Sequence, residues 1–319
     1  MAKQEAVEII SYGEPLIGIY PPMNRSLGED VPLSKTWGGD TSNMALALTK
    51  LGHRTGYITR VGNDGFGHSF LDLWRRNGVD TSQITMDEEH RTGLYFVSFE
   101  DGKHEFTYYR KNSAASFVSS DDIDWQFVGQ AKVLHLSGIS QAISTNAMEV
   151  SFDLLEFAKS KGILVSYDVN YRPPLWKRET ARAVILHTIA EYADILEITE
   201  DELEFLGYGD TPETFLSHFT RSPRIFAIKR GDQGATLREG EKEIRLEPFK
   251  VNVEDTVGAG DAFDAGLIAG VLEGMSFEQL GLFASAVAAM TCRGVGPLRM
   301  QPSREEAWSF LESQHAIKS

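Results

Sequence analysis

The stretch DTVGAGDAF, residues 255–263, guides the interpretation of the whole sequence. Gly258, Ala259 and Gly260 lie between two aspartates, and an apolar helical pattern, FDAGLIAGVLEG, follows at once. Glycine is a poor helix former and costs about 1 kcal/mol relative to alanine inside a helix. Two glycines at a helix start therefore indicate that the backbone must approach another group closely.

The expected partner of this backbone is an anion, because amides in the first helical turn lack internal acceptors and lie at the positive end of the helix dipole. The amides of Gly258, Ala259 and Gly260 would stabilise a transferring phosphoryl group, and Asp261 would take a proton from an attacking hydroxyl. Alternatively, Asp261 only complements the helix dipole. The stretch is neither a P-loop nor a GxGxxG fingerprint, which disfavours a dehydrogenase.

A second glycine-rich helix start occurs in TWGGDTSN, residues 36–43. Gly38 and Gly39 free the backbone, and Asp40 and Asn43 can bond to the hydroxyl groups of a polyol. The alternative is an ordinary N-cap for the helix that follows.

Two further segments follow strand-like runs. In DVNYR, Asn170 and Arg172 would face a cleft, since open α/β sheets bind ligands at the carboxyl ends of their strands. Arg172 could pair with a phosphate or carboxylate there, or lie on a surface loop. IKRGDQG has the same placement and supplies Lys229, Gly231 and Gly234.

Short β-branched runs alternate with amphipathic segments, which predicts an α/β fold with a mostly parallel central sheet and helices on both faces. We expect one domain over residues 1–319. The predicted strands cover 56–62, 131–138, 163–170, 193–199 and 224–231, and the predicted helices cover 41–52, 67–78, 146–162 and 199–207.

Residues 93–110 interrupt this alternation and predict a β-hairpin with an Asp-Gly turn at 101–102. That turn places Tyr95 opposite Tyr108 and puts Arg110 on the same face. Both faces of the hairpin carry apolar side chains and need cover, which indicates a lid over a ligand, a subunit interface, or both. An additional antiparallel edge strand pair is the simpler alternative.

Composition excludes several classes of protein. The net charge of −15 disfavours nucleic acid and anionic membrane surfaces as partners. A single cysteine, Cys292, suits a reducing compartment, and the N-terminal residues predict neither signal peptide nor membrane span, so we expect a cytoplasmic protein. Histidines show no metal-ligand spacing.

Thr199 and Glu202 form a capping box, which is favoured over a magnesium role for Glu202.

These stretches together resemble the ribokinase-like (PfkB-type) carbohydrate kinases, from GEPL at residue 13 to GVGPL near 294. Two motif regions carry the resemblance, WGGDTSNMALALTKLG with RVGNDGFG, and DTVGAGDAFDAG. Within the family the sequence is most similar to the 2-keto-3-deoxygluconate kinases, in GEPL, GGDT, GLYF, FTYYRKNSAA, LHLSGIS and DVNYRPPLW.

The resemblance implies a ribokinase-like fold with a small β-sheet lid from about 13–37 and 92–111, Mg²⁺ and ATP as cofactors, and a homo-oligomer formed through the lid. It implies Asp261 as catalytic base with Gly258, Ala259 and Gly260 as anion hole. Substrate contacts carried over are Gly38, Gly39, Asp40, Asn43, Tyr95, Tyr108, Arg110 and Arg172. Nucleotide contacts carried over are Asn170, Arg172, Lys229, Gly231, Gly234, Gly258 and Gly260, and no residue is assigned to a metal.

The leading hypothesis is ATP-dependent phosphorylation of the primary hydroxyl of 2-keto-3-deoxygluconate. Arg110 and Arg172 disfavour a fructokinase or ribokinase acting on a neutral sugar, because buried arginines without an anion are costly. A non-catalytic sugar-binding member is the third alternative, disfavoured by the presence of Asp261. The sequence departs from the family in having Thr199 at the position of a common asparagine and Glu14 at the position of a common aspartate.

Overall fold

The computed structural model of this chain describes residues 6–22, 25–100, 103–209 and 211–314. Within these residues, nine strands form a large sheet in the order β13-β12-β11-β10-β9-β8-β1-β4-β5. The strands from β11 to β5 in this order are parallel, and β12 and β13 are added antiparallel at one edge. The strands are β1 (Ile9–Tyr12), β4 (Thr55–Gly62), β5 (Ile84–Asp87), β8 (Val133–Ser137), β9 (Leu164–Asp168), β10 (Ile195–Thr199), β11 (Ile225–Lys229), β12 (Ala235–Glu239) and β13 (Lys242–Leu246).

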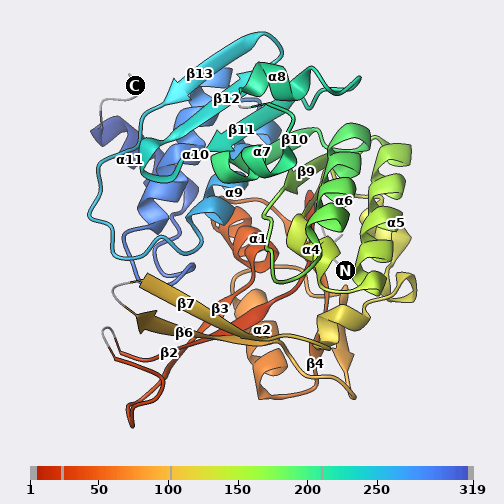
Figure 1. Cartoon of the computed structure of the whole chain (residues 1–319), viewed down its shortest axis with the longest axis vertical. Helices are drawn as coiled ribbons and strands as arrows, with labels where there is room; N and C mark the ends of the chain where they lie inside the picture. Colours follow the sequence, from red (N-terminus) through yellow and green to blue (C-terminus); the bar gives the residue numbers. More distant parts are fainter. Residues whose placement is uncertain (1–5, 23–24, 101–102, 210, 315–319) are drawn as a thin grey trace.

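Helices cover both faces of this sheet (Figure 1). The longer ones are α1 (Asp40–Lys50), α2 (Gly65–Arg76), α5 (Thr145–Lys161), α6 (Arg178–Glu191), α9 (Ala259–Leu272), α10 (Phe277–Thr291) and α11 (Arg304–Ser313). The shorter ones are α3 (Trp125–Val128), α4 (Gly138–Ala142), α7 (Glu200–Leu206), α8 (Pro212–Leu216) and the 3₁₀ turns η1 (Ala114–Phe117), η2 (Ser120–Asp122) and η3 (Gly231–Gln233).

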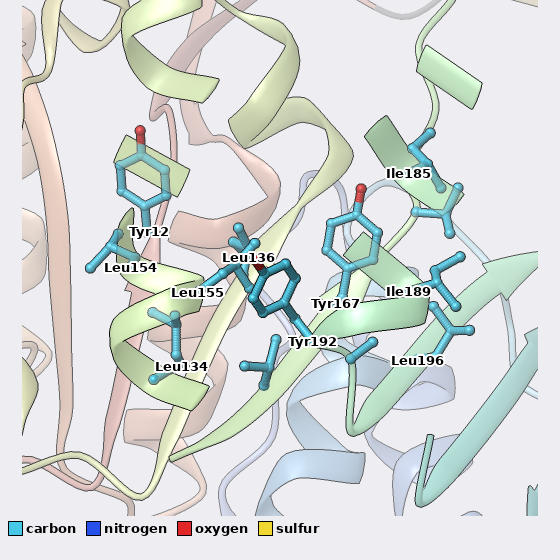
Figure 2. Packing of buried hydrophobic residues seen from close by; sticks show 14 of the residues in the cluster. Tyr12, Leu134, Leu136, Leu154, Leu155, Tyr167, Ile185, Ile189, Tyr192 and Leu196 are labelled. Carbon is cyan, nitrogen blue, oxygen red and sulfur yellow. The ribbon is translucent and has the colours of Figure 1, made fainter. Parts of the chain in front are cut away.

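Side chains alternate along the buried strands and therefore feed two separate cores. Leu134 and Leu136 of β8 point to the layer of α5 and α6, where they pack near Leu154 and Leu155 (Figure 2). Val133, on the same strand, belongs instead to the core beneath α1, α9 and α10. Because both faces are covered, the strands carry nearly continuous apolar runs, as is typical of parallel sheets.

A second, four-stranded sheet lies apart from the large one, in the order β3-β2-β6-β7 (Figure 1). We call it the small sheet; its strands are β2 (Leu16–Tyr20), β3 (Ser34–Gly38), β6 (Leu94–Glu100) and β7 (Lys103–Tyr109). Strands β6 and β7 are antiparallel and place Tyr95 opposite Tyr108, which confirms the predicted register. The predicted turn at 101–102 lies outside the described residues.

The predicted fold class is confirmed, including helices on both faces and a separate small sheet. Each predicted strand of the parallel sheet and each predicted helix occurs within a few residues of its expected position. The capping box of Thr199 and Glu202 also occurs, because the Glu202 side chain accepts a hydrogen bond from the Thr199 amide at 2.8 Å and the Thr199 hydroxyl accepts one from the Glu202 amide.

Helix α9 owes its position to close packing against α10. A Cβ atom added to Gly266 of α9 would lie 2.6 Å from the Cα atom of Ala284 in α10. That neighbour is backbone and cannot move aside as a flexible side chain could, so the two helix axes must separate to admit even one methyl group.

We therefore expect Gly266→Ala to lower the free energy of unfolding by about 1–3 kcal/mol, the usual cost of overpacking a core. Gly65→Ala is the matched control, because nothing lies within 4 Å of a Cβ added to this helical glycine. The control should be neutral or stabilising by up to about 1 kcal/mol. Urea unfolding of both variants makes the comparison, and equal stabilities would contradict the packing argument.

Candidate active site

The N-terminus of α9 presents open backbone amides. Gly258 is the N-cap and has a left-handed backbone with φ of 83°. Among the described residues, no acceptor bonds to the amides of Gly258, Gly260 or Asp261. The amide of Ala259 differs, because it donates to the carbonyl of Thr256 at 3.2 Å. The expectation that the Ala259 amide is open is therefore wrong, while those of Gly258 and Gly260 remain available to an anion.

Asp255 holds the loop that precedes these amides. One oxygen of its carboxylate accepts from the Val257 amide at 3.0 Å, and the other accepts from the Gly296 amide at 2.9 Å. A Cβ on Gly258 would lie 2.5 Å from Pro297, so the loop packs tightly against this later segment. The first aspartate of the motif thus has a structural contact of its own, which local sequence patterns did not reveal.

Asp261, in the first turn of α9, meets Asn43 of α1. The Asn43 side-chain amide donates to the Asp261 carboxylate at 2.8 Å, although 218 residues separate the two. Helices α1 and α9 pack against each other, which brings the two glycine-rich helix starts together (Figure 1). Asp261 is therefore held by a hydrogen bond at the junction of the two motifs.

The pKa of Asp261 is raised to about 7, first by burial and then by the nearby carboxylates of Asp40 and Asp168. The hydrogen bond from Asn43 and the charge of Lys229 act in the opposite direction. The side chain retains partial contact with solvent, which screens these interactions to some degree. A carboxyl group with a pKa near neutrality is well suited to accept a proton at physiological pH.

Asp40 links the two predicted substrate segments. Its carboxylate accepts from the Ser137 hydroxyl at 2.5 Å and from the Asn170 side-chain amide at 2.9 Å. Asn170 has an unusual backbone φ of 36°, a conformation that non-glycine residues adopt rarely. The structure therefore brings Asn170 beside a residue expected on the sugar side, at the carboxyl ends of β8 and β9.

Lys229, at the end of β11, sits between two carboxylates. Its ammonium lies 3.0 Å from Asp168 and 3.2 Å from Asp264. Burial favours the neutral amine, but these carboxylates outweigh it and raise the pKa of Lys229, so the side chain is charged at pH 7. A Cβ added to Gly260 would lie 3.6 Å from the Lys229 nitrogen, which places this charge beside the open amides of α9.

Gly231 is the first residue of the 3₁₀ turn η3 that follows β11, and Gly234 follows the turn. A Cβ added to Gly231 would meet nothing within 4 Å, whereas one added to Gly234 would collide with the backbone of Leu246. Among the described residues, no group of three or more His, Cys, Asp or Glu side chains forms a site that could hold a metal ion.

The small sheet contributes aromatic side chains. The rings of Tyr95 and Tyr108 have centroids 5.9 Å apart, and the Tyr95 hydroxyl lies 3.0 Å from that of Tyr20. Tyr95 is buried against the backbone of Gly38, where an added Cβ would lie 3.1 Å from its hydroxyl oxygen. The hairpin register predicted the tyrosine pair, whereas Tyr20 gave no signal because it lies on a strand distant in sequence.

The two arginines differ from their expected state. Arg110 forms an ion pair with Glu14, its Nε donating to the Glu14 carboxylate at 2.7 Å. Arg172 is exposed, and its guanidinium bonds only to the carbonyl of its own neighbour, Tyr171, among the described residues. The expectation of two buried arginines without a protein anion is therefore wrong, and that argument against a neutral sugar no longer holds.

Several residues of the site gave no clear sequence signal. Asp168 is the last residue of β9 and Glu14 lies just beyond β1, both at carboxyl ends of strands, so the general rule for ligand sites in α/β sheets could have pointed to them. Asp264 lies three residues after Asp261 on the same helix and was read only as part of an apolar pattern.

Comparison with known proteins identifies the family of the chain. The model for the pfkB family carbohydrate kinases matches residues 8–304. The chain belongs to the pfkB family of carbohydrate kinases. It is therefore an ATP-dependent phosphotransferase that acts on a sugar.

Individual relatives divide between two substrates. The chain is 34% identical to 2-dehydro-3-deoxygluconokinase of Bacillus subtilis over 320 residues, which cover 98% of this chain and 97% of that protein. It is 35% identical to "Probable fructokinase-3" of Arabidopsis thaliana over 318 residues, which cover 96% of this chain and 92% of that protein. Among solved structures, an uncharacterized sugar kinase from Pyrococcus horikoshii in complex with ATP matches with a TM-score of 0.85 at 30% sequence identity. The match covers 97% of this chain and 100% of that chain.

No helix among the described residues has both the length and the apolar character needed to span a membrane.

The raised pKa of Asp261 leads to a prediction about pH. A proton acceptor must be ionised, so kcat/KM should fall as the pH drops through about 7, well above the usual range of an aspartate. Asn43→Ala removes a hydrogen bond that favours the carboxylate form of Asp261. The fall of kcat/KM at acidic pH should therefore begin at higher pH in this variant. Rate profiles of both proteins between pH 5 and 9 measure the shift, and coincident acidic limbs would contradict this role of Asn43.

Proposed function

We propose that this kinase transfers the γ-phosphoryl group of ATP to the primary hydroxyl of 2-keto-3-deoxygluconate. The observation that carries the proposal is the position of Asp261, which Asn43 orients beside the open amides of Gly258 and Gly260. A proton acceptor next to an anion site is the arrangement that phosphoryl transfer to a hydroxyl requires.

In the proposed reaction, Asp261 accepts the proton of the primary hydroxyl while that oxygen attacks the γ-phosphorus. The bond to the bridging oxygen breaks and ADP leaves, and the amides of Gly258 and Gly260 donate to the negative charge on the transferred group. Lys229, whose ammonium lies beside Gly260, adds positive charge there.

We assign the remaining residues by their place around this centre. Sugar contacts are proposed for Gly38, Gly39, Asp40, Asn43, Tyr95, Tyr108, Arg110 and Arg172, and nucleotide contacts for Asn170, Arg172, Lys229, Gly231, Gly234, Gly258 and Gly260. The described residues place carboxylates near the amides, but no group of three or more of them could hold a metal ion. Mg²⁺ in kinases is held largely by phosphate and water oxygens. We therefore propose that Mg²⁺ enters with ATP, and we assign it no protein ligand.

The choice of an acidic sugar is supported by the Bacillus subtilis relative and by Arg110, which lies next to the tyrosine pair. A fructokinase is the second candidate. It is favoured by the similar identity to a plant fructokinase and by the ion pair of Arg110 with Glu14, which leaves no unbalanced positive charge at Arg110. A non-catalytic sugar-binding protein would have no use for a proton acceptor at Asp261.

We expect the purified protein to form ADP fastest with 2-keto-3-deoxygluconate when this sugar, fructose and ribose are compared side by side. A higher kcat/KM for fructose or ribose would refute the proposed substrate and leave the kinase chemistry intact.

Asp261→Asn is the control for the chemistry: turnover should fall by about 10²- to 10⁴-fold, the usual contribution of general base catalysis. Binding of ATP to this variant, measured by calorimetry, should remain within a few-fold of wild type.

We also propose that the chain forms one domain in which the small sheet acts as a lid and pairs with the small sheet of a second copy. Three aromatic side chains of β7 support this assembly, since Phe106, Tyr108 and Tyr109 expose 39%, 42% and 64% of their surface. Exposed aromatic groups gathered on one strand are typical of interaction surfaces.

Sedimentation equilibrium should therefore show a dimer or larger assembly for the wild type. Tyr109→Lys should dissociate it, because a charge would be buried without a partner in the interface. Val253→Lys is the matched control at a site with 55% exposure outside the small sheet, and it should leave the assembly unchanged. A wild-type protein sedimenting as the 35.5 kDa monomer would refute this assembly.

A further inference from the structure

Glu14 is a buried acidic residue next to residues proposed to bind the sugar. It follows β1 at the carboxyl end of the large sheet, and its side chain is 0% exposed. Two nitrogens of the Arg110 guanidinium, Nε and Nη2, donate to the same Glu14 oxygen. The other oxygen accepts from the Ser113 hydroxyl at 2.5 Å, so both carboxylate oxygens are satisfied.

This pair connects the two sheets of the molecule. Arg110 directly follows β7 of the small sheet, whereas Glu14 lies two residues beyond the end of β1 in the large one. Removing Arg110 from Glu14 would leave a fully buried carboxylate without its counter-ion, which is strongly unfavourable. Sugar binding that separated the pair would carry this cost, and the paired side chains together carry no net charge.

The pair also lies against the residues proposed to bind the sugar. The Arg110 guanidinium carbon lies 5.6 Å from the centre of the Tyr108 ring. On the other side, a Cβ added to Gly39 would lie 2.4 Å from the Glu14 carbonyl oxygen, so Glu14 touches the start of α1. That helix carries Asp40 and Asn43.

We propose that Glu14 sets the preference of this kinase between acidic and neutral sugars by neutralising Arg110. The carboxylate of Glu14 repels a substrate carboxylate bound at Arg110 and leaves a neutral sugar unaffected. This proposal rests on the proposed function, because it assumes that the sugar binds beside Arg110. It makes Glu14 a specificity-determining residue that acts through Arg110.

A purely structural role for Glu14 gives a different expectation. If the ion pair only fastened the small sheet to the large one, weakening it would slow the reaction of every sugar to the same extent. The ratio of kcat/KM for 2-keto-3-deoxygluconate to kcat/KM for fructose separates the two accounts, because effects common to both substrates cancel in it.

The test is Glu14→Gln, which keeps the size and the hydrogen-bonding reach of the side chain and removes its charge. We expect the ratio to rise at least about fivefold, since Arg110 then presents an unbalanced positive charge to the acidic sugar. Ser113→Ala is the matched control. It removes one hydrogen bond from Glu14 but leaves the carboxylate charged, so its ratio should stay within about twofold of wild type.

A second comparison makes the same test with different variants, in case Glu14→Gln alone does not fold. The ratio should be at least about fivefold higher in the double variant Glu14→Gln/Arg110→Lys than in Arg110→Lys, because lysine keeps a positive charge beside Glu14 and the only difference is the Glu14 charge. The proposal would be overturned if the ratio changed less than twofold in whichever comparison uses folded variants. Equal decreases of kcat/KM for both sugars would overturn it as well.

Failure of the proposed function gives a different result. A wild type that phosphorylates fructose but not 2-keto-3-deoxygluconate would refute the proposed substrate. The inhibition constant of 2-keto-3-deoxygluconate against fructose would then replace the ratio. That constant should fall at least about fivefold in Glu14→Gln if Glu14 repels the acid, and an unchanged constant would refute the role of Glu14 independently.

Discussion

The architecture of this kinase depends on the contact between the N-terminal turns of α1 and α9. The order of the large sheet reverses between β1 and β8, and open α/β sheets bind ligands at such a reversal, beyond the carboxyl ends of the strands. Both helices begin there, and the hydrogen bond from Asn43 to Asp261 joins them. The dense packing of α9 on α10 keeps this contact in place, because Gly266 leaves no room for adjustment.

The same contact determines the electrostatics of the site. The chain carries a net charge of −15, so its overall field repels an anionic nucleotide. Attraction must come from local groups, and the open amides of Gly258 and Gly260 lie next to the ammonium of Lys229. The acidic surroundings serve a separate purpose, because Asp40 and Asp168 help to raise the pKa of Asp261 into the range of a useful proton acceptor.

Sequence patterns predicted the elements of this structure better than its long-range pairs. Periodicity located the strands and helices, and a two-residue turn was enough to pair Tyr95 with Tyr108, because such contacts are set by neighbouring residues. The ion pair of Glu14 with Arg110 spans 96 positions and depends on how two sheets meet. No local pattern encodes that meeting, so the sequence alone predicts no protein partner for Arg110.

The corrected state of Arg110 bears on how one fold serves two kinds of sugar. An unpaired buried guanidinium would require an anionic substrate, whereas a guanidinium held by Glu14 offers donors without demanding a charge. Similar identities to a 2-dehydro-3-deoxygluconokinase and to a plant fructokinase are then less surprising. Under the proposed function, the backbone amides and Asp261 act on a hydroxyl and a phosphoryl group that both reactions share. Under the proposed role of Glu14, discrimination depends on the charge balance at the junction between the large sheet and the small sheet, where a change of one side chain leaves helix α9 untouched.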